Sequence, residues 1–335
     1  MNRRLLTLLI LCLPLARLLA QDQAPAFEFT TPKHKPVKSL YKTITFLDSR
    51  RDTSCIGVLD SSRKKIVRLI LRSPVQPQLD NILTALTDDR AGDGELLFQL
   101  RRFSFAEQAM TRYCYLIATL YKKAGDRYTR LADLDTVMSI NTPGKIKEAL
   151  GDLGNEIVDK FIAKSIALAP AGSDSYSLAE IQQMDAIEKK HLPLYTAAAY
   201  VNGFYSRFAS FANQTPDLKG EVKTNDSGKI TDIRIDDPKW KKTREHIYAV
   251  VYKGTPYVVT HYGCYPLEKI GEDFYFTGDL RVNATSGELA GSQLALGLVG
   301  RSLVASAGNR STYQVVIDHH NGEFIHLMVL DMDPK

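Results

Sequence analysis

Histidine and carboxylate side chains gather near the end of the 335-residue chain, where Asp318, His319 and His320 precede an Asn-Gly pair. Imidazole and carboxylate groups are ligands that zinc takes in proteins. Asp318 and His320 share a face if the preceding strand continues, and a hairpin at Asn-Gly would bring His326 close to them. The sequence therefore offers Asp318, His320 and His326 as an alternative metal site. We favour the simpler interpretation, an exposed hairpin tip that is polar because it is solvated.

A charged loop follows the first predicted strand. Asp48, Arg50, Arg51 and Asp52 come directly after residues 40–47, in which polar and apolar side chains alternate. Guanidinium groups recognise carboxylates and phosphates through paired hydrogen bonds. Runs of this kind are also common as solvated loops whose ion pairs contribute little. We retain these four residues as a candidate binding site.

Aromatic side chains recur along the predicted strands of the second half. Tyr257 and Tyr262 belong to this set, which could line a site for a sugar or a peptide. Aromatic residues on strands more often fill a core. Tyr257 and Tyr262 are therefore candidate binding residues, and the core interpretation stays open beside them.

Common catalytic motifs are missing from the sequence. It contains no Gly-x-Ser-x-Gly elbow, Walker loop, Cys-x-x-Cys pair or His-Glu-x-x-His motif. His261 and Cys264 place an imidazole near a thiol, but residues three apart on a strand face opposite sides. We therefore expect no cofactor and favour a protein without enzymatic activity. The alternative is a secreted hydrolase that uses this pair or a metal at His319, His320 and His326.

The first twenty residues predict export. Arg3 and Arg4 precede an apolar stretch over residues 5–15, and Ala20 offers a small residue at the cleavage point. This pattern is typical of a secretory signal peptide and predicts a periplasmic, envelope-associated or secreted protein. Cleavage removes three arginines and no acids, which lowers the net charge from +5 to +2. A nearly balanced charge argues against nucleic acid as a partner.

Three cysteines remain after such cleavage: Cys55, Cys114 and Cys264. An odd number excludes a fully paired disulfide framework. Cys55 and Cys114 could pair if their strands adjoin, but we expect buried free thiols.

A glycine-rich segment covers residues 287–308. Gly287, Gly291 and Ala295 have the small-residue spacing that can pack membrane helices. Arg301 interrupts the apolar run, and an arginine at a bilayer centre costs about 3 kcal/mol. We expect a loop beside a sheet and no transmembrane helix in the mature chain. A membrane-associated assembly protein that uses this segment is the alternative.

The first half predicts a sheet covered by helices. Apolar residues recur at helical spacing over residues 76–86, and strands follow between residues 96 and 140. From Thr142-Pro143 an amphipathic helix extends to Ala169, roughly 40 Å at 1.5 Å per residue. In the first of the three strands, one face carries Leu96, Phe98 and Leu100, and the other carries Leu97, Gln99, Arg101 and Phe103.

The second half predicts mainly antiparallel strands and turns. Residues 202–216 contain Phe204, Phe208 and Phe211 at helical spacing and predict a short aromatic helix. The fold class is therefore α+β, an N-terminal αβ domain covered by a long helix and a C-terminal, mainly antiparallel β domain. The predicted segments are a signal peptide (1–20), a flexible leader (21–37), an αβ domain (38–170), a linker helix (171–195) and a β-rich domain (196–335).

Two stretches resemble known families. Residues 38–169 resemble the αβ domain of auxiliary lipoproteins of ABC-type transport systems, on Asp48-Ser-Arg50, Ile56-Gly57 and the helix around Ala149 to Val158. The chain lacks the anchoring cysteine of those lipoproteins. Residues 200–331 resemble an uncharacterised β-rich module of secreted Gram-negative proteins, on Gly203 to Phe211 followed by Thr215-Pro216. The resemblances imply an envelope accessory protein and transfer no catalytic residues.

The sequence as a whole thus predicts an exported, non-catalytic accessory or binding protein of the cell envelope. Its expected partner is another envelope protein or a small ligand.

Overall fold

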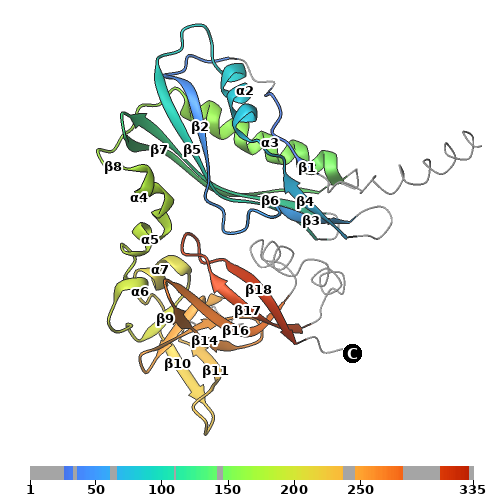
Figure 1. Ribbon diagram of the computed structural model, residues 1–335. Coiled ribbons are helices and arrows are strands. Elements are labelled where there is room, and N and C mark those ends of the chain that lie inside the picture. The colour runs from blue at the N-terminus through green and yellow to red at the C-terminus, as the bar shows by residue number, and fades with distance from the viewer. Residues whose placement is uncertain are drawn as a thin grey trace, which may run out of the picture.

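The computed structural model describes residues 26–32, 36–60, 66–108, 111–141, 146–236, 246–281 and 310–331. Over these ranges the chain is a mixed α+β protein rich in strands, which confirms the predicted class. Figure 1 shows two parts, a large sheet with helices above and smaller sheets below. We call them the N-terminal part (26–176) and the C-terminal part (203–331). The predicted signal peptide and glycine-rich segment lie outside the described residues, and the domain limits stay a prediction.

The N-terminal part is built on one eight-stranded sheet of order β1-β4-β3-β5-β6-β7-β8, with β2 also paired to β5. β5 runs parallel to β2 and antiparallel to β6, so it lies at the centre of the sheet. The strands are β1 (Ala26–Phe27), β2 (Tyr41–Asp48), β3 (Gly57–Asp60), β4 (Ile66–Leu71), β5 (Gly94–Gln108), β6 (Thr111–Ala124), β7 (Arg127–Asn141) and β8 (Ser175–Tyr176).

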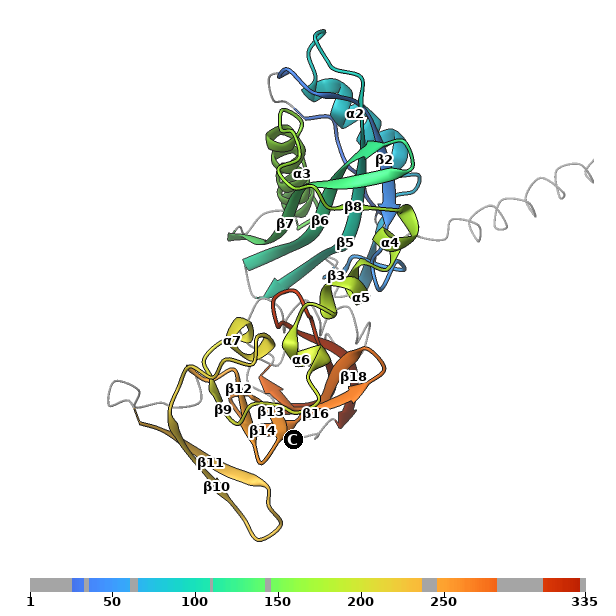
Figure 2. The ribbon, with the colours of Figure 1, turned by 90° about the vertical axis from the view of Figure 1, so that its left-hand side faces the viewer.

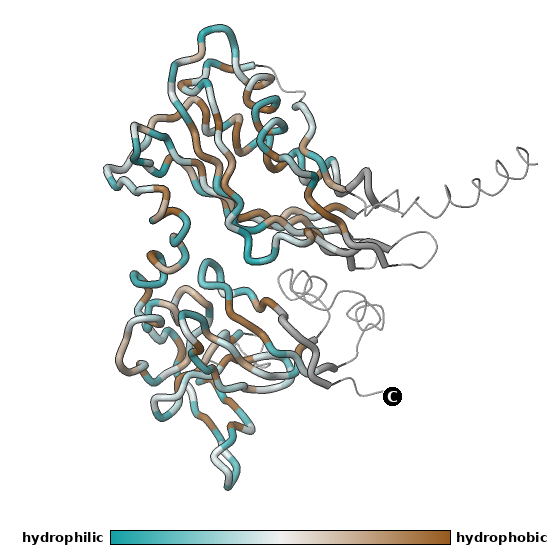
Figure 3. Tube along the Cα trace, in the orientation of Figure 1, coloured by the Kyte–Doolittle hydropathy of each residue, from teal (hydrophilic) through white to brown (hydrophobic). Residues whose placement is uncertain are grey.

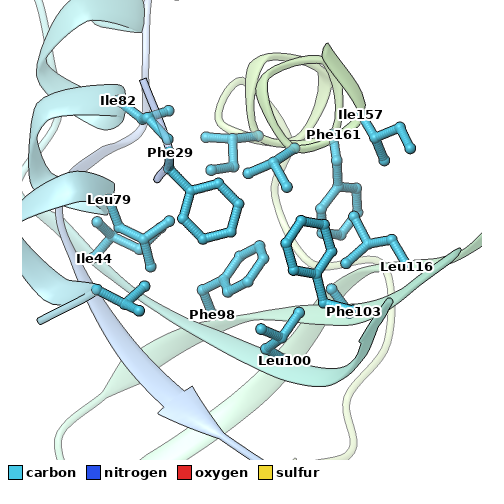
Figure 4. Packing of buried hydrophobic residues seen from close by; sticks show 14 of the residues in the cluster. Phe29, Ile44, Leu79, Ile82, Phe98, Leu100, Phe103, Leu116, Ile157 and Phe161 are labelled. Atoms are coloured by element: carbon cyan, nitrogen blue, oxygen red, sulfur yellow. The ribbon is translucent and has the colours of Figure 1, made fainter. Parts of the chain in front are cut away.

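Two helices cover one face of this sheet. α2 (Gln76–Leu86) has the predicted bounds, and α3 (Ile146–Ser165) lies beside it. At 20 residues α3 is about 30 Å long, shorter than predicted because it ends before Ala169. Figure 4 shows their apolar side chains, such as Leu79 and Phe161, packed on Phe98 and Phe103 of β5. This face holds the main core of the N-terminal part.

A β-bulge in β5 changes which side chains face this core. The register with β6 shifts between Leu100 and Arg102, so Arg101 is the extra residue. Leu100 and Phe103 both belong to the core, which places Arg101 and Arg102 together on the opposite face. The prediction that Phe103 shares a face with Arg101 is wrong, because strict alternation does not survive a bulge.

The predicted flexible leader is too long. Phe27 and Phe29 are 5% and 4% exposed and belong to the N-terminal core. Ala26–Phe27 forms β1, which pairs in parallel with β4. Two phenylalanines in a polar, proline-containing stretch are enough to bind it to the sheet, since burying each one stabilises the fold by about 2 kcal/mol.

Three short helices, α4 (Leu178–Gln182), α5 (Met184–Lys189) and α6 (Pro193–Thr196), connect the two parts along one side. Ser177 and Glu180 form a capping box at the start of α4. The single linker helix predicted here is instead interrupted at Gln183 and again before Pro193. Ile181 and Met184 pack on Leu97 and Tyr121, on the sheet face opposite α2 and α3.

The C-terminal part contains two four-stranded antiparallel sheets and one two-stranded ribbon. The first sheet has the order β14-β13-β12-β9 and the second β15-β16-β17-β18. Their strands are β9 (Gly203–Tyr205), β12 (Ala249–Tyr252), β13 (Thr255–Val259), β14 (Cys264–Pro266), β15 (Glu268–Ile270), β16 (Asp273–Arg281), β17 (Arg310–Ile317) and β18 (Phe324–Asp331). The ribbon pairs β10 (Gly220–Thr224) with β11 (Ile230–Ile235).

The predicted aromatic helix is only partly present. Helix α7 covers Phe208–Ala212, whereas Gly203–Tyr205 forms β9 and pairs with β12. Phe204 and Phe211 consequently belong to two different apolar clusters. The aromatic residues have helical spacing although they lie on a strand and on a short helix. The spacing alone therefore predicted a helix that begins too early.

Apolar segments alternate with polar ones along the strands of both parts, as the brown and teal stretches of Figure 3 show. Among the described residues, no helix is both long enough and apolar enough to cross a membrane. Cys55, Cys114 and Cys264 are all buried, and none of them forms a disulfide among the described residues, as the sequence predicts.

Candidate functional site

The turn between β17 and β18 inserts between the two parts of the molecule. Figures 1 and 2 both place this turn beside α5 and below β5. Asp318 is 9% exposed and His319 is 7% exposed. The Gly322 N–H donates to the Asp318 carbonyl at 2.8 Å and closes the turn. The predicted exposed tip is therefore wrong, because the turn docks against charged groups of β5 and α5 that are distant in sequence.

Asp318 orients His320 within this turn. One oxygen of its carboxylate, Oδ1, lies 2.8 Å from His320 Nδ1 and also accepts the His320 backbone N–H at 3.0 Å. Burial alone would raise the pKa of Asp318, but the hydrogen bond and charge of His320, with Arg102, hold that pKa well below its usual value. With a proton on Nδ1, the lone pair of a neutral His320 lies on Nε2. Nε2 is buried and has no hydrogen-bond partner among the described residues.

Arg101 joins the sheet to α5. Its guanidinium donates to both oxygens of Glu188, at 3.1 and 2.6 Å, and also to Asp185. Arg130 of β7 donates to Glu188 Oε1 at 2.9 Å. Arg101 reaches α5 because the β5 bulge turns its side chain away from the core.

Glu188 also approaches both histidines of the turn. Its Oε2 lies 3.4 Å from His319 Nε2 and 3.5 Å from His320 Nε2. Burial would raise the pKa of Glu188, but hydrogen bonds from His319, Arg101 and Arg130 hold it well below its usual value. Burial lowers the pKa of His319, which the Glu188 hydrogen bond only partly offsets. The neutral imidazole is therefore favoured at neutral pH.

A cavity of about 460 Å³ lies between the two parts. Its polar wall includes arginines from the loop after β2 and from β5, and carboxylates and histidines from α5 and the β17–β18 turn. Its lining comprises Ser49, Arg50, Arg51, Asp52, Cys55, Arg101, Arg102, Phe103, Ser104, Ile117, Asp185, Ile317, Asp318, His319, His320 and Ile325.

A second cavity of about 340 Å³ adjoins the first. Arg101, His319 and His320 line both cavities, whereas Arg50 and Arg51 line only the larger and Glu188 only the smaller of the two. The histidine pair therefore belongs to the wall that the two cavities share.

The predicted charged loop contributes to the larger cavity. The guanidinium of Arg50 is held by both carboxylate oxygens of Asp48, at 2.8 and 2.6 Å. Its Nη1 is buried and has no hydrogen-bond partner among the described residues. Arg51 reaches Asp273 of the C-terminal part at 3.0 Å. The structure thus brings Arg50, Arg51 and Asp52 to one cavity together with Asp318 and His320.

The other predicted site residues lie elsewhere. Tyr257 is on β13 and packs against the apolar cluster that contains Phe204. Tyr262 follows β13 and makes a ring contact with the exposed His261. Neither tyrosine lines either cavity. His326 is on β18, where its backbone pairs with Val315, and its side chain lies outside the described residues.

Arg101, Asp185 and Glu188 belong to the site but were not predicted from the sequence. Arg101 and Arg102 were adjacent charges in an apolar strand, which is a pattern that can indicate a bulge. Asp185 and Glu188 are three residues apart on a helix and share a face. Nothing in the sequence indicated that this face meets Arg101.

No family model matches the chain. No curated protein matches it either. Among solved structures, a Xanthomonas campestris protein of the family DUF330 matches 49% of this chain and 97% of its own, with 12% identity and a TM-score of 0.28. A second, described as an uncharacterized protein, matches 43% of this chain and 99% of its own, with 12% identity and a TM-score of 0.26. Similarity this low transfers no function.

Proposed function

We propose that this protein is an exported, non-catalytic accessory protein of the cell envelope that binds a small ligand between its two parts. The ligand carries a carboxylate or phosphate group and a short apolar portion. The observation that supports this most is the lining of the 460 Å³ cavity, where four arginine side chains meet three carboxylates. The arginines are Arg50, Arg51, Arg101 and Arg102.

The polar wall suits an anionic group. Arg50 is held by Asp48 through Nε and Nη2, which fixes the plane of its guanidinium. A guanidinium fixed in this way loses little entropy when it binds a carboxylate or phosphate. Arg51 is half exposed, so it can reorient toward a ligand.

The rest of the cavity suits an apolar group. Phe103, Ile117, Ile317 and Ile325 contribute apolar side chains, and Cys55 contributes a thiol. Ligand sites generally combine a mostly apolar wall with a few placed polar groups. A ligand with an anionic head and a short apolar tail would match both walls.

The arrangement favours binding over catalysis. Asp318 and His320 form the orienting half of a catalytic triad, which requires a nucleophile within hydrogen-bond reach of Nε2. His320 Nε2 has no hydrogen-bond partner among the described residues. Among the described residues, Asp318 and His320 therefore lack the nucleophile contact that a hydrolase of the triad type needs.

Calorimetric titration with octyl phosphate, octanoate and neutral octanol tests the ligand class. We expect both anions to bind at least tenfold more tightly than octanol. Arg50→Gln should weaken anion binding about tenfold or more, since a charged hydrogen bond contributes about 1.5–3 kcal/mol. Arg90→Gln is the control, because Arg90 is exposed and pairs only with Asp88 among the ion pairs of the described residues. Equal binding of octanol, or no binding of any probe, would contradict the proposal.

Fractionation of cells that express the full chain tests export. We expect the protein outside the cytoplasm with Gln21 as its first residue, determined by mass spectrometry. A variant that starts at Gln21 after an initiator methionine should stay in the cytoplasm. Full-length protein retained in the cytoplasm would contradict export without affecting the ligand test.

A further inference from the structure

We propose that His319, His320 and Glu188 bind a divalent transition-metal ion, with Asp185 or a water molecule as the fourth ligand. The site lies in the wall shared by the two cavities and goes beyond the proposed ligand binding. It differs from the set predicted from sequence, since only His320 is common to both.

The distances from the Glu188 oxygen to the two histidine nitrogens match tetrahedral coordination. Glu188 Oε2 lies 3.4 Å from His319 Nε2 and 3.5 Å from His320 Nε2. Zinc bonds to histidine nitrogen and carboxylate oxygen are about 2.1 Å long, which gives tetrahedral ligand separations of about 3.4 Å. One ligand atom from each of the two histidines, Glu188 and Asp185 lies within 4.8 Å of the others.

The hydrogen bond to Asp318 orients His320 to donate its Nε2 lone pair to a metal ion. Asp318 accepts at Nδ1 and so leaves the Nε2 lone pair for a metal, the arrangement by which a second carboxylate commonly orients a metal-binding histidine. Nε2 is buried with no hydrogen-bond partner among the described residues. A metal ion would give this otherwise unsatisfied nitrogen a partner. Asp318, predicted as a ligand, thus becomes the residue that positions one.

Glu188 keeps a free lone pair in spite of its arginine partners. Arg130 and Arg101 Nη1 donate to Oε1, whereas the one arginine nitrogen that donates to Oε2 is Arg101 Nη2. The contact of His319 Nε2 with Oε2 at 3.4 Å is the one that a shared metal ion would replace. A carboxylate oxygen has two lone pairs, so Oε2 can accept one hydrogen bond and one metal bond. The two arginines hold the carboxylate in place without using the position that faces the histidines.

The local charge also suits a divalent cation. The ion pairs around the two histidines contain five carboxylates and three guanidinium groups, an excess of two negative charges among these groups. A divalent ion would balance this excess. The groups are Asp133, Asp185, Glu188, Asp318 and Glu323 with Arg101, Arg102 and Arg130.

The donor types select the metal. Two imidazole nitrogens favour zinc, copper, nickel or cobalt over calcium and magnesium, which prefer oxygen ligands. Zinc accepts two histidines, one carboxylate and an open fourth position without difficulty.

Titration of chelator-treated protein with Zn²⁺ in competition with a chromogenic chelator tests the assignment. We expect one Zn²⁺ per chain and at least a hundredfold weaker binding in His319→Ala and in His320→Ala. Asp318→Asn should weaken binding tenfold or more, as loss of an orienting carboxylate does. His261→Ala is the matched control, because His261 is exposed and outside the cluster.

Co²⁺ provides a second readout that does not depend on affinity. Bound to the wild type, it should give the visible absorption of tetrahedral cobalt, and His320→Ala should abolish that absorption. Circular dichroism establishes that each variant is folded, and Glu188→Gln serves if the histidine variants unfold. In that case Glu188→Gln should abolish the tetrahedral cobalt absorption, because Glu188 is a proposed ligand.

Three outcomes would overturn the assignment. They are no stoichiometric Zn²⁺, equal binding by the wild type and both histidine variants, or loss of binding in His326→Ala but not in His319→Ala. Arg50→Gln should bind Zn²⁺ normally, so failure of the metal site and failure of the anion site are separable.

Discussion

The guanidinium of Arg101 on β5 meets the carboxylate of Glu188 on α5 through two parallel hydrogen bonds, Nη1 to Oε1 at 3.1 Å and Nη2 to Oε2 at 2.6 Å. The Arg101 side chain is only 5% exposed. Glu188 also contacts His319 in the β17–β18 turn, so this pair joins the sheet, the connecting helices and the C-terminal part. It is one of several ion pairs at this junction, where Arg102 also pairs with Asp318 and Lys189 with Asp273.

Removing Arg101 should destabilise the protein strongly. Arg101→Leu leaves the Glu188 carboxylate partly buried with Arg130 as its remaining arginine partner. Breaking one side of a buried ion pair typically costs 3–5 kcal/mol, and the partial exposure of Glu188 argues for about 3 kcal/mol. Urea unfolding measures this cost. Arg90→Leu removes an exposed ion pair and should change the free energy of unfolding by less than about 0.5 kcal/mol. Equal effects of the two variants would contradict the role assigned to Arg101.

The stability of the fold should fall in acid. Glu188 and Asp318 have pKa values held well below normal in the folded protein, so the unfolded chain binds more protons as the pH falls below about 4.5. The stability these groups contribute is complete above that pH and is lost as the pH falls toward their folded pKa values. Burial raises the pKa of Glu323 and of Asp135. These two groups therefore titrate at higher pH than Glu188 and Asp318, and their protonation stabilises the folded protein instead of destabilising it.

Urea unfolding between pH 5 and pH 3 measures this dependence. Glu188→Gln should be less stable at pH 5 and should lose less stability on acidification than the wild type. Parallel pH curves for the two proteins would show that the Glu188 pKa is not depressed by folding.

Local patterns predicted much of the N-terminal part. The periodic apolar residues of α2 gave its bounds, and the Ser-x-x-Glu spacing of Ser177 and Glu180 is that of the capping box at the start of α4. Helix α2 and the capping box of α4 both depend on interactions between residues that are close in sequence, so the sequence alone indicates them. The bulge at Arg101 does not, because it is set by pairing with β6.

The candidate site was less predictable, because its members come from three distant segments. Arg50, Asp318 and His320 were identified by residue type, but no sequence pattern distinguished Glu188 from other acidic residues of the predicted linker helix. Only the docking of the β17–β18 turn beneath β5 brings Glu188 to the histidines. Asp318 was predicted as a ligand, and its bond to His320 Nδ1 gives it an orienting role that spacing could not reveal.

Two glycines of α3 should respond oppositely to alanine. A Cβ at Gly154 would lie 2.8 Å from the rings of Phe27 and Phe105, whereas a Cβ at Gly151 would meet nothing within 4 Å. Gly154→Ala should destabilise the protein by about 1–3 kcal/mol through overpacking. Gly151→Ala should stabilise it by up to about 1 kcal/mol, since alanine is the better helix former. Thermal unfolding of both variants measures the contrast, and stabilisation by both would show that α3 does not pack closely at Gly154.

The turn that carries His319 and His320 should depend on Gly322 in particular. Gly322 has φ +79°, and a Cβ there would overlap the ring of Phe208. Gly271 has φ +62° in the β15–β16 turn, and a Cβ added to it would meet nothing within 4 Å. Gly271→Ala should therefore cost only the backbone term, about 1 kcal/mol, while Gly322→Ala adds a steric cost of about 1–3 kcal/mol.

The same pair tests the link between this turn and the proposed metal site. Tyr248 donates from its hydroxyl to the Gly322 carbonyl at 2.8 Å, so a shift at Gly322 would also disturb the hydrogen bond that holds the turn. Gly322→Ala should weaken Zn²⁺ binding because it moves both histidines relative to Glu188, and Gly271→Ala should leave binding unchanged. Both variants are compared with the wild type by urea unfolding and by Zn²⁺ titration under conditions in which each is folded. Equal losses of stability in the two variants would contradict the close packing of Gly322 on Phe208, and unchanged Zn²⁺ affinity in a destabilised Gly322→Ala would separate the turn's conformation from metal binding.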